Sequence, residues 1–242
     1  MNTSFHIESH SMQLRSAILL YGNGGHVDYA TQHPVGQNSD NAPVILPGSA
    51  LTQEELASAY QALLGKTPLQ MLDNRTLAFN VSTLVFWSEP QVRTTYFDCP
   101  EPMGKRSGPV PHPGLVFVWQ DHGLSVFAVK GRKRPSLNTP LFKAPYMNVY
   151  AGGSICMGNV KVPKPEPGNI SACEAAFFQS RFTHANHATQ VQYPGGIYTL
   201  WVDLLASKAN RFPEQALAPM EPVHGKQQFT MADLLSKAGD LS

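Results

Sequence analysis

The sequence predicts an α+β fold in which a four-stranded antiparallel meander is flanked by helices and preceded by a β extension. Strand-like runs with short, turn-rich connections occupy the middle of the chain. Capping boxes of the form Ser/Thr-x-x-Glu predict a helix before these runs and another after them. A separate β-rich run with a glycine turn lies near the N-terminus. We therefore expect an extension over residues 1–50 and a main domain over 51–242.

The extension is predicted to be a hairpin followed by a linker. Residues 12–21 favour a strand, a Gly-Asn-Gly-Gly turn interrupts them at 22–25, and β-forming residues resume over 26–31. Residues 33–50 are rich in Pro, Gly, Asn and Ser, a composition typical of connecting segments.

The main domain is predicted to begin with a helix, because Thr52 and Glu55 are spaced as a capping box and apolar residues then recur at helical spacing up to Gly65. We expect the four strands at 77–87, 92–97, 115–119 and 124–129. The prolines within 107–113 predict a stiff extended segment that crosses the surface before the third strand.

Three further helices are expected after the strands. A capping box at Ser171–Glu174 predicts a helix that continues through Phe182 and ends near 183–187. Helical runs are also expected at about 198–207 and 231–237.

Composition restricts the classes of function. A chain of 242 residues with 42% hydrophobic content can bury a large core. Its formal net charge of +1 creates no global field for nucleic acid or an acidic membrane, so direct nucleic-acid binding is not expected. No apolar run approaches the length of a membrane span and no leader segment is evident, so we expect a cytoplasmic protein without membrane attachment.

Neither a metal nor a cofactor is expected. The 3 cysteines, Cys99, Cys156 and Cys173, are too few and too irregularly spaced for a disulfide framework or a four-cysteine zinc site, which favours a reducing compartment. His184 and His187 could bind a metal if they were helical, but no third ligand is in view, and histidine is common at helix ends. No glycine motif for phosphate binding occurs, so no nucleotide is expected.

The segment 148–156 places an amide and a thiol at a fixed separation across a glycine turn. Asn148 begins a short extended run, Gly153 permits a reversal with positive φ, and Cys156 follows on a loop. A thiolate there could attack an acyl carbonyl, and a nearby carboxamide could stabilise the resulting oxyanion. Each residue also has a structural explanation, since a free cysteine is commonly a small buried hydrophobe and asparagine commonly forms turns.

Other conspicuous residues have simpler interpretations. Cys99 and Cys173 have no partner pattern, and we expect both to be structural. A basic turn is either a solvated connection or a docking site for an acidic partner. Its residues are Lys130, Arg132, Lys133 and Arg134.

The segment Asn148-Val-Tyr-x-x-Gly-x-Ile-Cys156 resembles the Asn-to-Cys segment of the ubiquitin-conjugating (UBC) family. With Ala144-Pro145, Cys156-Met-Gly158 and the run Phe177–His184, it is similar to protein B of the bacterial PRTRC cassette, a prokaryotic UBC-like family. The resemblance implies a UBC-like fold. It also implies that Cys156 accepts a ubiquitin-like protein as a thioester and transfers it to an amine such as a lysine.

The resemblance implies partners and roles as well. The partners are a ubiquitin-like protein of the PRTRC protein C type and a ThiF-like activating enzyme. A JAB-domain protein and a ParB-related protein of the same cassette, which is often found on plasmids, are further candidates. The family's His-Pro-Asn triplet is here Tyr146-Met147-Asn148, so Tyr146 and Gly153 are expected to support the loop. Asn148 would stabilise the oxyanion, and His184 would deprotonate the incoming nucleophile.

Three functions remain open at this stage. The first is a conjugating enzyme that uses Cys156, Asn148 and His184. The second is a non-catalytic UBC-like binding or scaffold module. The third is a cysteine hydrolase with the chain order Cys156, His184, Asp203, although the prolines at 163–167 exclude the helix start at which such enzymes place their cysteine.

Overall fold

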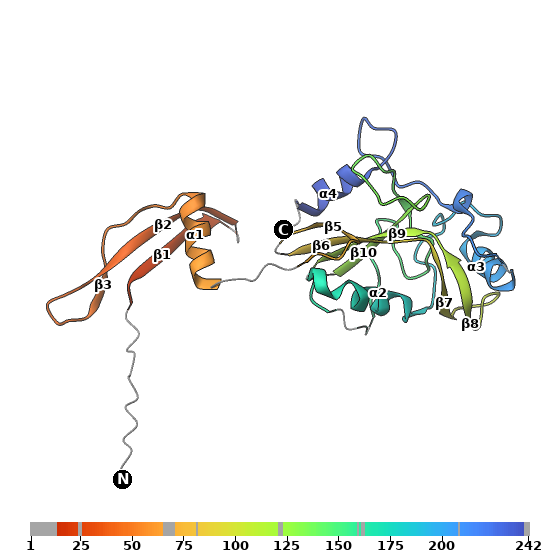
Figure 1. The fold of residues 1–242 in the computed structure, drawn as a ribbon, viewed down its shortest axis with the longest axis horizontal. Helices are drawn as coiled ribbons and strands as arrows, with labels where there is room; N and C mark the ends of the chain where they lie inside the picture. Colours follow the sequence, from red (N-terminus) through yellow and green to blue (C-terminus); the bar gives the residue numbers. More distant parts are fainter. Residues whose placement is uncertain are drawn as a thin grey trace, which may run out of the picture. The chain divides into compact units, whose positions relative to one another are not determined.

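A computed structural model describes residues 14–23, 26–64, 71–80, 82–120, 123–158, 160, 163–207 and 209–239. The chain divides into two compact units, Met1–Gln70 and Met71–Ser242. Figure 1 colours the first unit red to orange and the second yellow to blue.

The first unit contains a small antiparallel sheet and a helix. β1 (Ser16–Asn23) pairs with β2 (His26–Gln37), which confirms the predicted hairpin; its turn at 24 and 25 lies outside the described residues. β2 continues beyond the hairpin and pairs with β3 (Pro43–Ile45) and β4 (Ser49–Ala50). The segment expected to be a linker is therefore part of this sheet.

Helix α1 (Gln53–Leu64) follows the sheet and belongs to the first unit, whereas the predicted boundary at residue 50 assigns it to the main domain. The predicted capping box is confirmed. The Thr52 N–H donates to Glu55 Oε2 at 2.8 Å, and the Glu55 N–H donates to Thr52 Oγ1 at 3.2 Å. Each residue thereby satisfies a backbone N–H at the start of the helix.

The second unit is built on a five-stranded sheet in the order β11-β10-β9-β6-β5 and a three-stranded sheet in the order β12-β7-β8. The strands are β5 (Thr76–Phe79), β6 (Thr83–Ser88), β7 (Gln91–Asp98), β8 (Lys105–His112), β9 (Gly114–Gln120), β10 (Gly123–Val129), β11 (Phe142–Lys143) and β12 (Arg181–Phe182). The pairs are antiparallel except that β12 runs parallel to β7.

Strand pairing in this unit differs from the predicted meander. The meander places 92–97 beside 115–119, but β7 pairs with β8 and β6 pairs with β9. Very short breaks separate β6 from β7 and β8 from β9, so these strands form one long hairpin divided between two sheets. The proline-rich segment 107–113 therefore forms most of β8 and does not simply cross the surface. β8 tolerates proline because it has a neighbour on one side only.

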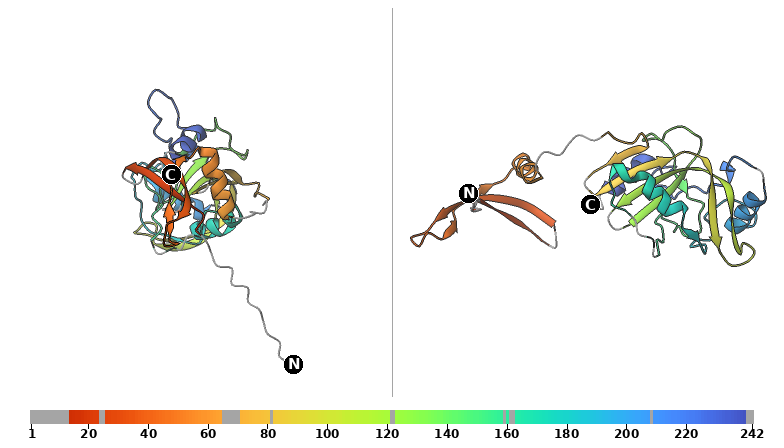
Figure 2. Two further views of the ribbon diagram at one scale, coloured as in Figure 1. Left: turned by 90° about the vertical axis from the view of Figure 1, so that its left-hand side faces the viewer. Right: turned by 60° about the horizontal axis from the view of Figure 1, so that its bottom comes forward.

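The five-stranded sheet is buried on both faces. One face, which includes Phe117, packs with side chains of α2 (Ile170–Phe178) and α3 (Gly196–Ala206). The opposite face, which includes Phe127, packs with α4 (Met231–Gly239). Figures 1 and 2 show α2 and α4 on opposite sides of this sheet. No helix in the described ranges is both long and apolar enough to cross a membrane.

The C-terminal helices test the remaining predictions. α3 and α4 confirm the helices expected at 198–207 and 231–237. The second capping box is wrong, because the N-cap of α2 is Asn169 and makes no side-chain hydrogen bond. The predicted extension of α2 to Phe182 is also wrong. α2 ends at Phe178, because the chain then enters β12 and pairs with β7.

Candidate active site

Asn148 and Cys156 lie opposite each other in a short hairpin. An isolated bridge joins Val149 and Ile155. On either side of it, the Cys156 N–H donates to the Asn148 carbonyl at 2.8 Å and the Tyr150 N–H donates to the Ser154 carbonyl at 2.9 Å. Opposed residues of an antiparallel pair project to the same face, and alternate residues of a strand share a face. The backbone therefore directs Asn148, Tyr150 and Cys156 to one side.

Gly153 allows this hairpin to lie against β10. Its φ is +95°, and a Cβ atom there would lie 2.6 Å from the ring of Phe127. The Gly153 carbonyl accepts a hydrogen bond from the Val126 N–H at 2.8 Å. Both the backbone conformation and the close contact therefore require glycine, as expected for a residue that supports the loop.

Cys156 is the accessible thiol of the three. Its side chain is exposed, whereas Cys173 is buried and Cys99 is partly buried. Burial raises the pKa of Cys99 to about 11, and its Sγ donates to the Phe182 carbonyl at 3.1 Å. Burial raises the pKa of Cys173 to about 12. Both of these thiols stay protonated at neutral pH, so neither is available as a thiolate nucleophile.

Tyr150 is a site residue that the sequence interpretation missed. Its side chain is 47% exposed. A hydrogen bond with Cys156, reinforced by the negative charge of the thiolate, raises the pKa of the Tyr150 phenol. The raised pKa keeps the Tyr150 hydroxyl protonated at neutral pH, so it is available as a donor on the face of the hairpin that carries Cys156. The hairpin register was the available signal, since Tyr150 lies two positions after Asn148 on the same face.

The Asn148 side chain joins the hairpin to the segment that follows α2. Its Nδ2 donates to the Arg181 carbonyl at 3.0 Å. Its Oδ1 accepts from the Thr183 N–H at 3.0 Å and from the Thr183 hydroxyl at 3.3 Å. A carboxamide nitrogen carries two hydrogens, and one of them is used here. The other remains for an oxyanion, so Asn148 can both brace the loop and stabilise developing charge.

Thr183 connects Asn148 to His184. Its hydroxyl lies 3.0 Å from His184 Nδ1. The hydroxyl has one proton and Asn148 Oδ1 can only accept, so the network is complete when Thr183 donates to Asn148 and Nδ1–H donates to Thr183. A neutral imidazole in this tautomer has an unprotonated Nε2, as a general base requires.

The structure brings the three predicted catalytic residues to one cavity. Asn148, Cys156 and His184 all line a cavity of about 230 Å³. Polar side chains of the segment after α2 complete its wall, namely Ser180, Arg181 and Thr183. No carboxylate belongs to the lining, within the part of the chain that the structure describes.

Tyr146 lies beneath the hairpin and not in the cavity. It is 1% exposed, and its hydroxyl lies 2.7 Å from His112 Nδ1. The other ring nitrogen of His112 lies 2.8 Å from the Thr95 hydroxyl. Burial, with a smaller effect from the charge of Arg93, lowers the pKa of His112 to about 3. This neutral network holds the segment that leads into Asn148.

Asp203, the third member of the hydrolase triad, is engaged elsewhere. Its Oδ2 accepts a hydrogen bond from the Tyr193 hydroxyl at 2.8 Å. It does not line the cavity, and His184 Nδ1 meets Thr183 instead. The geometry therefore lacks the carboxylate that would orient the histidine of a Cys-His-Asp triad.

The basic turn does not line this cavity, and most of its side chains have partners within the chain. Lys133 is exposed. Lys130 Nζ lies 4.5 Å from the centre of the Phe142 ring, Arg132 donates to the Pro90 carbonyl, and Arg134 donates to the carbonyls of Asn74 and Thr76.

Comparison with known proteins finds a match to one protein family. The family model for prokaryotic E2 family D matches residues 52–220, a range that contains α1, both sheets of the second unit and every residue of the cavity. A search of curated proteins and a search of solved structures each found no match. The family model covers well over half of the chain. The chain belongs to prokaryotic E2 family D.

Proposed function

We propose that this protein is a ubiquitin-like-protein conjugating enzyme that carries its modifier as a thioester on Cys156. In the first step the Cys156 thiolate attacks the thioester carbonyl that joins the modifier to an activating enzyme. A new C–S bond forms and the activating enzyme's cysteine leaves as a thiolate. In the second step an amine attacks the Cys156 thioester, an amide forms, and the Cys156 thiolate leaves.

The observation that carries the proposal is the placement of Cys156. It is the exposed thiol of the chain, it lies opposite Asn148 in the hairpin, and it shares a cavity with His184. The free hydrogen on Asn148 Nδ2 serves the tetrahedral oxyanion of either step. Such a donor is typically worth about 3 kcal/mol of barrier.

His184 and Tyr150 have separate tasks in this scheme. Nε2 of His184 takes the proton that the attacking amine loses, while Thr183 holds the ring by its Nδ1. The Tyr150 hydroxyl donates to the Cys156 thiolate. This donation stabilises the sulfur as a leaving group when the thioester is discharged.

The partners follow from the resemblance of the sequence to the PRTRC cassette. We propose a ubiquitin-like protein of the PRTRC protein C type as the modifier and a ThiF-like protein as the activating enzyme. The JAB-domain and ParB-related proteins of the cassette are candidate processing or target proteins. Because the reaction needs a free thiol, the proposal places it in the reducing cytoplasm.

The test is reconstitution. The purified chain is incubated with its cassette's activating enzyme, ubiquitin-like protein and ATP, and analysed on gels with and without thiol. Wild type should form an adduct that thiol removes. Cys156→Ser should form a thiol-resistant oxyester, and Cys99→Ser, which changes a cysteine outside the cavity, should behave as wild type. If Cys156→Ser conjugated substrate as fast as wild type, the proposal would fail.

The alternative functions predict different results in reconstitution, in a binding assay and with a thiol inhibitor. A binding or scaffold module would bind the ubiquitin-like protein without any adduct, and Cys156→Ala would not weaken that binding. A cysteine hydrolase would react with a substrate-like thiol inhibitor in the absence of the activating enzyme. The engagement of Asp203 by Tyr193 argues against the hydrolase.

A further inference from the structure

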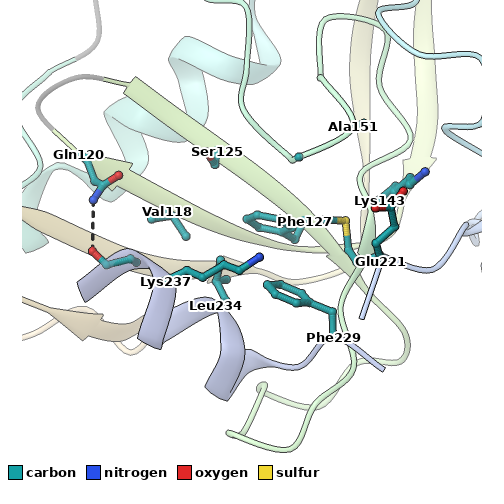
Figure 3. Close-up of a pocket in the computed structure, with 13 residues that line it drawn as sticks. Val118, Gln120, Ser125, Phe127, Lys143, Ala151, Glu221, Phe229, Leu234 and Lys237 are labelled. Atoms are coloured by element: carbon teal, nitrogen blue, oxygen red, sulfur yellow. Dashed lines mark hydrogen bonds between the residues drawn. The ribbon is translucent and has the colours of Figure 1, made fainter. Parts of the chain in front are cut away.

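A second cavity lies on the opposite face of the five-stranded sheet, between the sheet and α4. Its volume is about 320 Å³, within the range of small-molecule sites. Figure 3 shows its floor on β9 and β10, with Val118 and Phe127, and its opposite wall on α4, with Leu234 and Lys237. The apolar character of these walls favours a ligand with an apolar body.

The charged groups at this cavity favour an anion. Lys237 Nζ lies 5.0 Å from the centre of the Phe229 ring, at the cavity wall. Among the described residues no carboxylate lies within ion-pair distance of Lys237. Lys143 also borders the cavity and is 9% exposed, and its ammonium donates to the hydroxyl and the carbonyl of Thr189, at 3.3 and 3.4 Å.

Lys237 therefore brings to this partly apolar space a charge that has no carboxylate partner among the described residues, whereas the Lys143 ammonium is held by Thr189, which is not part of the lining. The Glu221 side chain supplies the acid of the lining. Lys237 is exposed, so a carboxylate that pairs with it keeps its contact with water and gains a modest electrostatic attraction. We propose that this cavity binds a small molecule that has an apolar chain and one carboxylate. The chain lies against Phe127 and Leu234, and the carboxylate meets Lys237.

The cavity also touches the hairpin of the candidate active site. Ala151 and Gly152, from the turn between Asn148 and Cys156, form part of its wall. Phe127 is shared, because the backbone of Gly153 lies directly against its ring. A bound ligand therefore contacts the turn that presents Cys156, and we expect it to change the reactivity of that thiol. This consequence rests on the proposed function, whereas the binding itself does not.

The binding experiment compares three ligands of one chain length and different head groups. Decanoate, decanol and decylamine are titrated into the full chain by calorimetry, without activating enzyme or ubiquitin-like protein. Decanoate should bind most tightly and decylamine least. Lys237→Gln should weaken decanoate roughly threefold to fivefold and leave decanol unchanged. Lys105→Gln removes the same charge from β8, outside the cavity lining, and should bind decanoate as wild type does.

A second variant tests the location. Ser125 lines the cavity and is partly exposed, so Ser125→Leu should occupy part of the space and weaken decanoate and decanol together. No saturable binding of decanoate, or equal binding of decylamine, would overturn the proposal. So would binding that neither Lys237→Gln nor Ser125→Leu weakens.

The coupling to Cys156 is measured separately. Alkylation of Cys156 by iodoacetamide is followed with and without saturating decanoate, and Ser125→Leu should remove the difference. Binding without any change in alkylation would overturn the coupling and leave the ligand site in place. A chain that binds decanoate but never forms a thioester would instead contradict the proposed function alone.

Discussion

Tyr150 lies on the same face of the hairpin as Cys156, and hydrogen bonding to Cys156 together with the charge of its thiolate raises the pKa of the Tyr150 phenol. The raised pKa reflects the presence of the thiolate, because a second negative charge beside it is unfavourable. We therefore predict that Cys156→Ala lowers the pKa of Tyr150 toward that of an ordinary tyrosine. Titration of the chain by ultraviolet absorbance, with Tyr150→Phe to identify the signal, measures this shift.

Tyr150→Phe should also slow the reactions of the thiol. Without the hydroxyl the thiolate loses a donor, so alkylation of Cys156 at neutral pH should slow by about twofold to fivefold. Tyr193→Phe removes a hydroxyl that hydrogen-bonds Asp203 and does not line the cavity, and it should alkylate at the wild-type rate. Equal rates for Tyr150→Phe and wild type would contradict a role for this hydroxyl.

Asn148 variants separate bracing from oxyanion stabilisation. Asn148→Asp keeps the acceptor for the Thr183 N–H and hydroxyl but loses the amide hydrogens, including the one donated to the Arg181 carbonyl. It should form and discharge the thioester about a hundredfold more slowly. Asn148→Ala also loses the acceptor and should in addition lower the free energy of unfolding by about 1–3 kcal/mol. Single-turnover discharge and urea denaturation provide the two measurements.

Thr183 should act through His184. Thr183→Val keeps the backbone N–H that binds Asn148 and removes the hydroxyl that meets His184 Nδ1. Discharge of the thioester to an added amine should slow by about tenfold, the effect expected when one hydrogen bond that orients the histidine is lost. Thr183→Ser should restore it. If Thr183→Ser, which keeps the hydroxyl, discharged as slowly as Thr183→Val, a role for this hydroxyl would be contradicted.

His112 should make stability depend on pH. The unfolded imidazole gains a proton below its ordinary pKa of 6.5, whereas the folded one stays neutral down to about pH 3. Stability is therefore complete above about pH 6.5 and decreases as the pH falls toward 3, by up to about 1.4 kcal/mol per pH unit. His112→Gln should flatten this slope in urea denaturation between pH 6.5 and 4. His224→Gln, at an exposed histidine, should leave it unchanged.

Glu174 of α2 forms ion pairs with Arg75, which directly precedes β5, and with Arg93 of β7. Its carboxylate accepts from Arg75 at 2.6 Å and from Arg93 at 2.9 Å, and its side chain is 8% exposed. Glu174→Gln should destabilise the second unit by about 3 kcal/mol, because the Arg93 guanidinium loses its anion while Arg75 keeps only its pair with Asp73. Glu89→Gln breaks an exposed pair with Arg132 at 3.8 Å and should cost less than about 0.5 kcal/mol.

Sequence patterns within a few residues predicted the hairpin that carries Asn148 and Cys156. The hairpin from Asn148 to Cys156 depends on a glycine turn and a short register, both readable within a few residues. The partners of Asn148 could not be read in this way, because Arg181 and Thr183 lie 33 and 35 residues further along the chain. Apolar spacing over 171–182 favoured a longer helix. Tertiary pairing of β12 with β7 overrides that preference.

Contacts between residues far apart in the sequence also decide which strands lie side by side. Prolines at 109 and 111 argue against an interior strand, and β8 is an edge strand, where a missing N–H is not needed for pairing. Which strands become edges depends on contacts across the whole sheet. The prediction therefore paired 115–119 with 124–129 correctly, as β9 and β10, but gave 92–97 the wrong neighbour.

The contrast among the three cysteines has a practical consequence. A maleimide dye added at neutral pH should react with one sulfur, because the pKa values of Cys99 and Cys173 are raised to about 11 and 12. The native chain thus offers a single labelling position without any engineered cysteine. A dye at Cys156 would sit in the hairpin between the two cavities, and its emission could report on events in both.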